Sequence, residues 1–175
     1  MWDTKNKERG FCMTVKSAIR LQIIALVLAA IAAVLCCVVA VKPEWVGITG
    51  LGEIRATPTA ALVESTGFVA VDIFCIVMMT RAKTSGSTKA AVVISALLLC
   101  LLAVIVEPVV HAWENQQLIV QVPQIEDATT GTALISVKLA LRELVRLILF
   151  VSGALSFLSM GGFWGKYANK AEQYR

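Results

Sequence analysis

Four long apolar stretches constrain the fold of this 175-residue chain more than any other feature. A helix needs about 20 apolar residues to cross the hydrocarbon core of a bilayer, which is about 30 Å thick. The stretches are Leu21–Val41, Ala56–Thr80, Ala90–Val110 and Leu147–Gly165. We therefore predict an all-α membrane protein, folded as a four-helix transmembrane bundle in contact with the lipid bilayer.

The composition leaves little room for a separate soluble module. Hydrophobic residues make up 58% of the chain and the mean hydropathy is +0.78, whereas the usual apolar share is about 45–50%. The first stretch is longer than the apolar part of a signal peptide, so we expect it to stay in the protein as a helix. The predicted organisation is an N-terminal segment (1–20), a four-span domain (21–165) with spans near 21–42, 58–80, 90–111 and 143–164, and a tail (166–175).

The distribution of basic residues matters more than the net charge of +4. Most of them flank the apolar stretches on one side: Lys5, Lys7, Arg9, Lys16, Arg20, Arg81, Lys83, Lys89, Lys166, Lys170 and Arg175. Cytoplasmic loops carry an excess of lysine and arginine, so we predict a multi-pass protein of the cell membrane with both termini in the cytoplasm. These charges also meet anionic lipid headgroups, and we expect no binding of nucleic acid.

Two helical patterns extend beyond the spans. Phe11, Val15 and Ile19 recur every four residues, which fits a short interfacial helix and a lead-in to the first span equally well. The last pattern starts near Ala133 and continues to about Gly162, which corresponds to about 45 Å of helix. We expect this fourth helix to extend beyond the outer membrane face.

Small residues at regular spacing predict where helix backbones approach one another, because small side chains permit close packing in lipid. The predicted helix-packing face consists of Ala25, Ala29, Ala33 and Cys37 in the first span and of Ser152 and Ser156 in the last. An equally weighted alternative for the first span is that alanine is simply common in apolar helices.

Charged side chains at membrane depth are the most informative polar feature. The predicted intramembrane charge network comprises Asp72, Glu64, Glu107, Lys138, Arg142, Glu143 and Arg146. A charge at the centre of a membrane helix costs about 2.5–3.5 kcal/mol on insertion scales, so Asp72 requires a partner. Counting from the expected outer helix ends places Arg146 at the depth of Asp72, and we expect these two to pair. Glu64 and Glu107 are expected to face Lys138 or Arg142 in a shallower layer.

Three interpretations of this network remain open. An internal salt-bridge clamp that fixes the register of the helices is favoured, because no second acid accompanies Asp72 at the midplane. The second interpretation is a proton, ion or substrate pathway, and the third is contact with a charge on a partner subunit. Next to Glu107, Pro108 removes a backbone donor. A kink in the third helix and its end are both compatible with this proline, and we favour the end because His111 and Trp113 follow closely.

The chain lacks the residue sets that are typical of enzyme active sites. His111 is the only histidine, which excludes bis-histidine haem ligation within one chain. The five cysteines lie outside the predicted outer loops, so neither an extracellular disulfide framework nor the loop cysteine pairs of a thiol–quinone oxidoreductase is expected. We therefore predict no enzymatic activity, no cofactor and no metal site.

Two functions follow from these observations. The first is a non-enzymatic accessory or structural subunit that binds a membrane protein partner, or a second copy of itself, through its helix faces and its second outer loop. The alternative is a small oligomeric transporter or channel that uses Asp72 together with Arg142 and Arg146.

Overall fold

The computed structural model describes residues 14–46, 58–81, 85–121 and 128–173, and these form helices with no strand among them. Four helices are long and apolar enough to cross a membrane, as the sequence predicted: Val15–Val41, Thr59–Arg81, Gly86–Gln117 and Ile135–Gly165. The full elements are α1 (Val15–Val41), the short 3₁₀ helix η1 (Pro43–Val46), α2 (Thr59–Arg81), α3 (Ser85–Leu101), the π-helical turn η2 (Leu102–Val106), α4 (Glu107–Gln121) and α5 (Ala128–Gln173).

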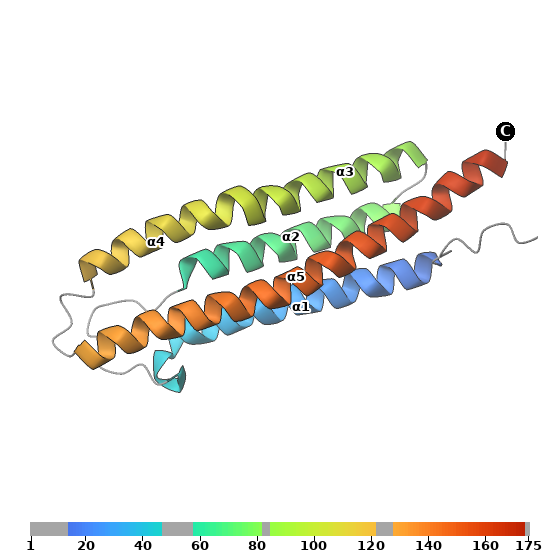
Figure 1. Ribbon diagram of the computed structural model, residues 1–175. Helices are drawn as coiled ribbons and strands as arrows, with labels where there is room; N and C mark the ends of the chain where they lie inside the picture. The colour runs from blue at the N-terminus through green and yellow to red at the C-terminus, as the bar shows by residue number, and fades with distance from the viewer. Residues whose placement is uncertain (1–13, 47–57, 82–84, 122–127, 174–175) are drawn as a thin grey trace, which may run out of the picture.

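The helices lie side by side and alternate in direction along the chain (Figure 1). The start of α1, the end of α2 and the end of α5 share one end of the bundle, which we call the Arg81 end. The start of α2, the end of α4 and the start of α5 share the other, which we call the Thr59 end. Helix α1 packs mainly on α5 and α2, and α3 closes the bundle against α2 and α5.

The buried face of α1 follows a spacing of alternately three and four residues. Its members are Ala18, Gln22, Ala25, Ala29, Ala32, Cys36 and Val39. Of the predicted face in this helix, Ala25 and Ala29 are buried, whereas Ala33 is only half-buried and Cys37 is exposed. A strict four-residue spacing advances by about 40° more than one full turn at each step, so it leaves the contact face, whereas an average spacing of 3.5 stays on it.

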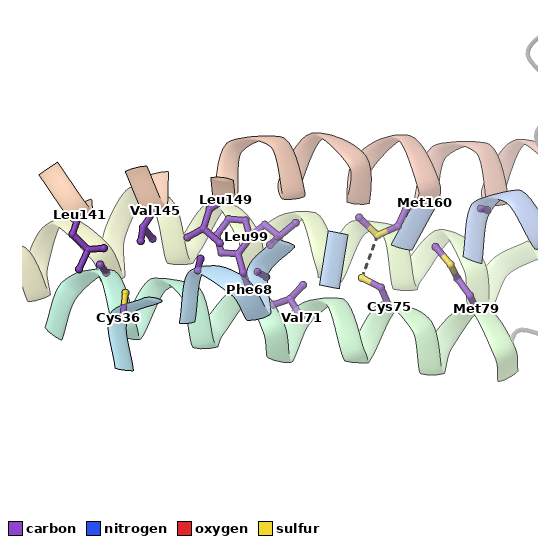
Figure 2. Packing of buried hydrophobic residues seen from close by; sticks show 14 of the residues in the cluster. Cys36, Phe68, Val71, Cys75, Met79, Leu99, Leu141, Val145, Leu149 and Met160 are labelled. Atoms are coloured by element: carbon purple, nitrogen blue, oxygen red, sulfur yellow. Dashed lines mark hydrogen bonds between the residues drawn. The ribbon is translucent and has the colours of Figure 1, made fainter. Parts of the chain in front are cut away.

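The core runs along the axis of the bundle between α1, α2 and α5. Figure 2 shows Val145, Leu149 and Met160 of α5 lying close to Phe68 and Cys75 of α2, with the Cys75 thiol 3.5 Å from the Met160 sulfur. Ser152 and Ser156 of α5 belong to the same buried face and are fully buried. Small side chains on α1 and α5 therefore bring these two helices close together.

The third membrane helix does not end at Pro108, contrary to our expectation. It continues through the π-helical turn η2 into α4 and ends at Gln121. The Glu107 amide donates to the carbonyl of Leu102, five residues earlier. Proline lacks an amide donor and its ring crowds the carbonyl four residues before it, and the wider turn immediately before Pro108 accommodates this within a continuous helix.

Helix α5 is longer than predicted at both ends. It contains 46 residues, or about 69 Å of helix, and starts at Ala128 rather than near Ala133. Its last turns extend past the other helices at the Arg81 end (Figure 1). Residues 1–13 lie outside the described part of the chain, and Val15 and Ile19 are part of α1, as the lead-in alternative predicted.

Candidate functional site

A layer of uncharged donors surrounds Asp72 in the middle of the bundle. Gln22 Nε2 donates to Asp72 Oδ1 at 2.8 Å and to Ser156 Oγ at 3.0 Å. The Ser156 hydroxyl also donates to Asp72 Oδ1, at 2.5 Å. Ser152 Oγ lies 3.4 Å from Asp72 Oδ2 and 2.9 Å from the Ala25 carbonyl to which it donates. We call Gln22, Asp72, Ser152 and Ser156 the inner polar layer, and it joins α1, α2 and α5.

The predicted pairing of Asp72 with Arg146 is wrong. Asp72 is bound by Gln22 and the two serines, whereas Arg146 binds Glu107. Helix α5 begins at Ala128, earlier than the expected outer helix end from which the depth of Arg146 was counted. Counting the same number of residues from the expected starts of the two helices therefore paired residues that lie at different depths along the bundle. Gln22 carried a signal, since it is the only polar side chain apart from two cysteines in the apolar stretch Leu21–Val41.

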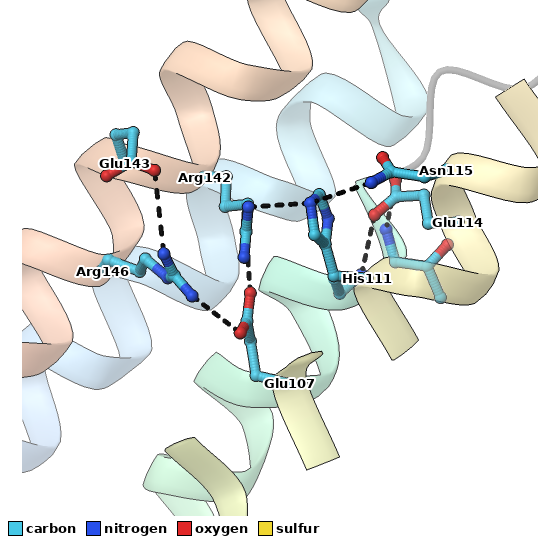
Figure 3. Close-up of polar contacts among 9 residues, drawn as sticks. Glu107, His111, Glu114, Asn115, Arg142, Glu143 and Arg146 are labelled. Atoms are coloured by element: carbon cyan, nitrogen blue, oxygen red, sulfur yellow. Dashed lines mark hydrogen bonds and ion pairs between the residues drawn. The ribbon is translucent and has the colours of Figure 1, made fainter. Parts of the chain in front are cut away.

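The arginines of α5 instead form a charged layer with α4 (Figure 3). Glu107 Oε1 lies 2.7 Å from Arg142 Nε, and Glu107 Oε2 lies 2.9 Å from Arg146 Nη2. Arg146 Nη1 is 3.8 Å from the exposed Glu143. The expected contact of Glu107 with Arg142 is therefore present, and Glu107 is buried beneath both arginines. The side chain of Lys138 lies outside the described residues.

His111 adds a neutral acceptor to the charged layer. Arg142 Nη1 lies 2.8 Å from His111 Nε2, and Asn115 Nδ2 lies 3.2 Å from the same nitrogen (Figure 3). A guanidinium donates and never accepts, so His111 Nε2 is the acceptor and the ring proton lies on Nδ1. The Nδ1 atom is buried and has no hydrogen-bond partner. We define the charged layer as Glu107, His111, Arg142, Glu143 and Arg146.

Glu114 of α4 caps the start of α2. Its carboxylate accepts hydrogen bonds from the Thr59 and Ala60 amides, each at 3.2 Å. The first amides of a helix have no partner within the helix, and a negative charge at this end is favourable. A cap supplied by a residue 55 positions away leaves no local sequence pattern.

Glu64 is the one member of the predicted network that has a buried carboxylate oxygen without a partner among the described residues. Its side chain is only 5% exposed, and Oε2 has no hydrogen-bond partner. It lines a cavity of about 460 Å³ between α2, the α3–η2 segment and α5. The other lining residues are Phe68, Leu99, Cys100, Ala103, Val104, Arg146, Leu149, Phe150, Gly153, Ala154 and Phe157. We call this cavity the lateral groove, because Val104 and Phe150 on its walls are exposed on the surface of the bundle.

Among the described residues, no group of three or more histidine, cysteine, aspartate or glutamate side chains is placed to hold a metal ion. No family model, curated protein or solved structure matches the chain. The geometry of the two polar layers and of the lateral groove is therefore the basis for a functional proposal.

Proposed function

We propose that this chain is a non-enzymatic membrane subunit that recognises an apolar partner inside the bilayer through the lateral groove. One observation carries the proposal: an apolar cavity of about 460 Å³ has a buried carboxylate oxygen, Glu64 Oε2, without a partner. A buried polar atom without a partner is costly. A partner that enters the groove and donates a hydrogen bond removes that cost.

The remaining members of the charge network support a structural role. Both oxygens of Glu107 are taken by arginines, and Asp72 is held by neighbours on α1 and α5. Polar contacts of this kind fix the relative position of membrane helices. The inner polar layer and the charged layer therefore hold the walls of the groove in place.

A transporter or channel remains the second candidate, because acids are buried at two depths on α2. Glu64 and Asp72 are eight residues apart, or about 12 Å along the helix. Phe68 and Val71 are buried between them. This apolar interval favours the binding role over a continuous ion pathway. Proton flux in proteoliposomes that disappears in Asp72→Asn would reverse this order.

Crosslinking inside a membrane tests the groove as a recognition site. A photoreactive amino acid is placed at Val104, on the wall of the groove, and at Val93, an exposed position of α3 outside it. We expect a defined adduct from Val104 only, and we expect it to be lost when Ala154→Phe fills the groove. Ala140→Phe, on an exposed position of the same helix outside the groove, is the matched control. Equal, non-specific labelling at both positions would contradict the proposal.

A further inference from the structure

The size of the lateral groove indicates what enters it. A helix that is 10–12 Å wide occupies on the order of 150 Å³ per residue, so a cavity of about 460 Å³ holds about three helical residues. Such a volume lies in the usual range for small-molecule sites. The walls are almost entirely apolar, with three phenylalanines and the small residues Gly153 and Ala154. The groove therefore suits a flexible hydrocarbon chain better than a second helix.

The polar part of the groove sets the chemistry of the occupant's head. Glu64 Oε2 is buried and accepts no hydrogen bond from the residues that the structure describes, so an occupant that donates one is favoured. Both oxygens of Glu107 are bound by Arg142 and Arg146, and no described ion pair reaches Glu64. A donor that also carries a positive charge suits the Glu64 carboxylate, because a hydrogen bond between charged groups is stronger than a neutral one.

Arg146 supplies the complementary half of a headgroup site. It lines the groove beside Glu64, and its side chain is 41% exposed. Its known contacts are to Glu107 through Nη2 and to Glu143 through Nη1. A guanidinium has five N–H donors, so Arg146 has donors left for a phosphate oxygen. A site with a carboxylate acceptor and a guanidinium donor matches a zwitterionic phosphate–ammonium head.

The depth of the site also fits a lipid head. Glu64 lies five residues after the start of α2 at Thr59, or about 8 Å along the axis. The headgroup region on each side of a bilayer is about 5–7 Å thick. A lipid of the leaflet at the Thr59 end thus reaches Glu64 with its head while its chain follows the groove toward Phe157.

The geometry points to a binding site for a phospholipid with a primary ammonium headgroup, of the phosphatidylethanolamine class. This inference rests on the proposed function, since it names the occupant of the same groove. The ammonium donates to Glu64, the phosphate accepts from Arg146, and one acyl chain fills the apolar cavity.

Stepwise methylation of the headgroup tests the inference without altering the protein. The purified full chain is titrated with lipids of identical acyl chains that carry ethanolamine, N-methylethanolamine, N,N-dimethylethanolamine or choline heads, and retained lipid is counted by native mass spectrometry. We expect affinity to fall with each lost N–H donor and to be at least tenfold lower for choline than for ethanolamine. Equal affinity across the series would overturn the assignment of the head.

Three variants separate this inference from the proposed function. Glu64→Gln should abolish the preference for ethanolamine over choline, whereas Glu143→Gln, an exposed acid outside the groove, should retain it. Ala154→Phe should abolish retention of every lipid in the series. If all heads bind equally and Ala154→Phe blocks them, the groove stands as a recognition site and only the head is wrong. If a phospholipid is retained equally with and without Ala154→Phe, both proposals fail. If no phospholipid is retained at all, the lipid assignment fails, and the crosslinking at Val104 decides whether the groove recognises another partner.

Discussion

At the scale of single residues, the neutral environment of Asp72 is the most informative finding. The insertion cost of an acid in the middle of a span led us to expect a cation, yet its neighbours are an amide and two hydroxyls from α1 and α5. Gln22 Oε1 beside it is buried without a partner. The donors of the layer thus leave at least one acceptor unsatisfied, and an amide at position 72 would supply a further donor.

Asp72→Asn should be tolerated better than Asp72→Leu. Leucine removes the acceptor of Gln22 and Ser156 and should lower the free energy of unfolding by about 2 kcal/mol, at about 0.6 kcal/mol per membrane hydrogen bond plus the cost of misfit. Asparagine keeps one acceptor and adds a donor near Gln22 Oε1, so its loss should be less than half as large. The measurement is reversible unfolding in mixed micelles, with Ile73→Val, on the exposed face, as the control. Equal losses in the two Asp72 variants would show that the charge itself is required.

The pairing of Glu107 with Arg142 should be energetically coupled, because Glu107 is 1% exposed and Arg142 15%. Removing one member of a buried pair leaves an uncompensated charge. A double-mutant cycle with Glu107→Gln and Arg142→Gln should give a coupling of at least about 1 kcal/mol. The matched cycle on Glu143 and Arg146, whose side chains are 61% and 41% exposed, should give less than about 0.5 kcal/mol. A larger coupling for the exposed pair would contradict the assignment of the buried pair as the clamp.

At the scale of helices, the close approach of α2 to the π-helical turn shapes one wall of the groove. Gly67 faces Leu102, and a Cβ atom added at Gly67 would lie 2.6 Å from Leu102 Cδ2. No glycine preference of the backbone is involved, since Gly67 is helical. A larger residue at this position requires the Leu102 side chain to move, and sequence periodicity alone does not reveal such a contact.

Gly67→Ala should therefore destabilise the bundle, and a smaller side chain at position 102 should relieve it. Overpacking of this kind costs about 1–3 kcal/mol. In the double variant with Leu102→Ala, we expect at least half of the cost of Gly67→Ala to disappear, measured by unfolding in micelles. Gly161→Ala is the control, because nothing lies within 4 Å of its added Cβ and alanine favours a helix by about 0.5–1 kcal/mol. If the effects of Gly67→Ala and Leu102→Ala on the free energy of unfolding are additive, the two positions are not in close contact.

At the scale of the whole molecule, the even number of long helices places the start of α1 and the end of α5 at the same end of the bundle. The charges at this end include Lys16, Arg20, Arg81 and Lys89. The positive-inside rule predicts that the Arg81 end faces the cytoplasm. The lateral groove, with Glu64 near the Thr59 end, then faces the outer leaflet.

Labelling of single cysteines tests this orientation. In a chain with its five cysteines replaced by alanine or serine, Gly86→Cys at the Arg81 end and Glu44→Cys at the Thr59 end are treated in intact cells with an impermeant maleimide. We expect labelling at position 44 and protection at position 86 until the cells are opened. The reverse pattern would place the termini outside and the groove in the inner leaflet.

The number and type of the long helices could be predicted from the sequence, because a run of about 20 apolar residues is typical of a membrane-spanning helix. The set of charged residues was also visible, but their pairing was not. The Asp72 contacts depend on the relative position of α5 and α2 along the bundle axis, and α5 starts at Ala128, earlier than the expected start near Ala133. The cap from Glu114, the turn before Pro108 and the lateral groove depend on contacts between distant segments, which no local pattern records.

The contact between Glu114 and the first amides of α2 bears on the order of biogenesis. The ribosome makes Thr59 and Ala60 about 55 residues before it makes their acceptor. Until the segment that contains Glu114 has been synthesised, the first amides of α2 lack this acceptor and form hydrogen bonds only with water or lipid headgroups. The second and third segments therefore mature as a unit, and a chain truncated before Glu114 should leave the start of the second crossing frayed.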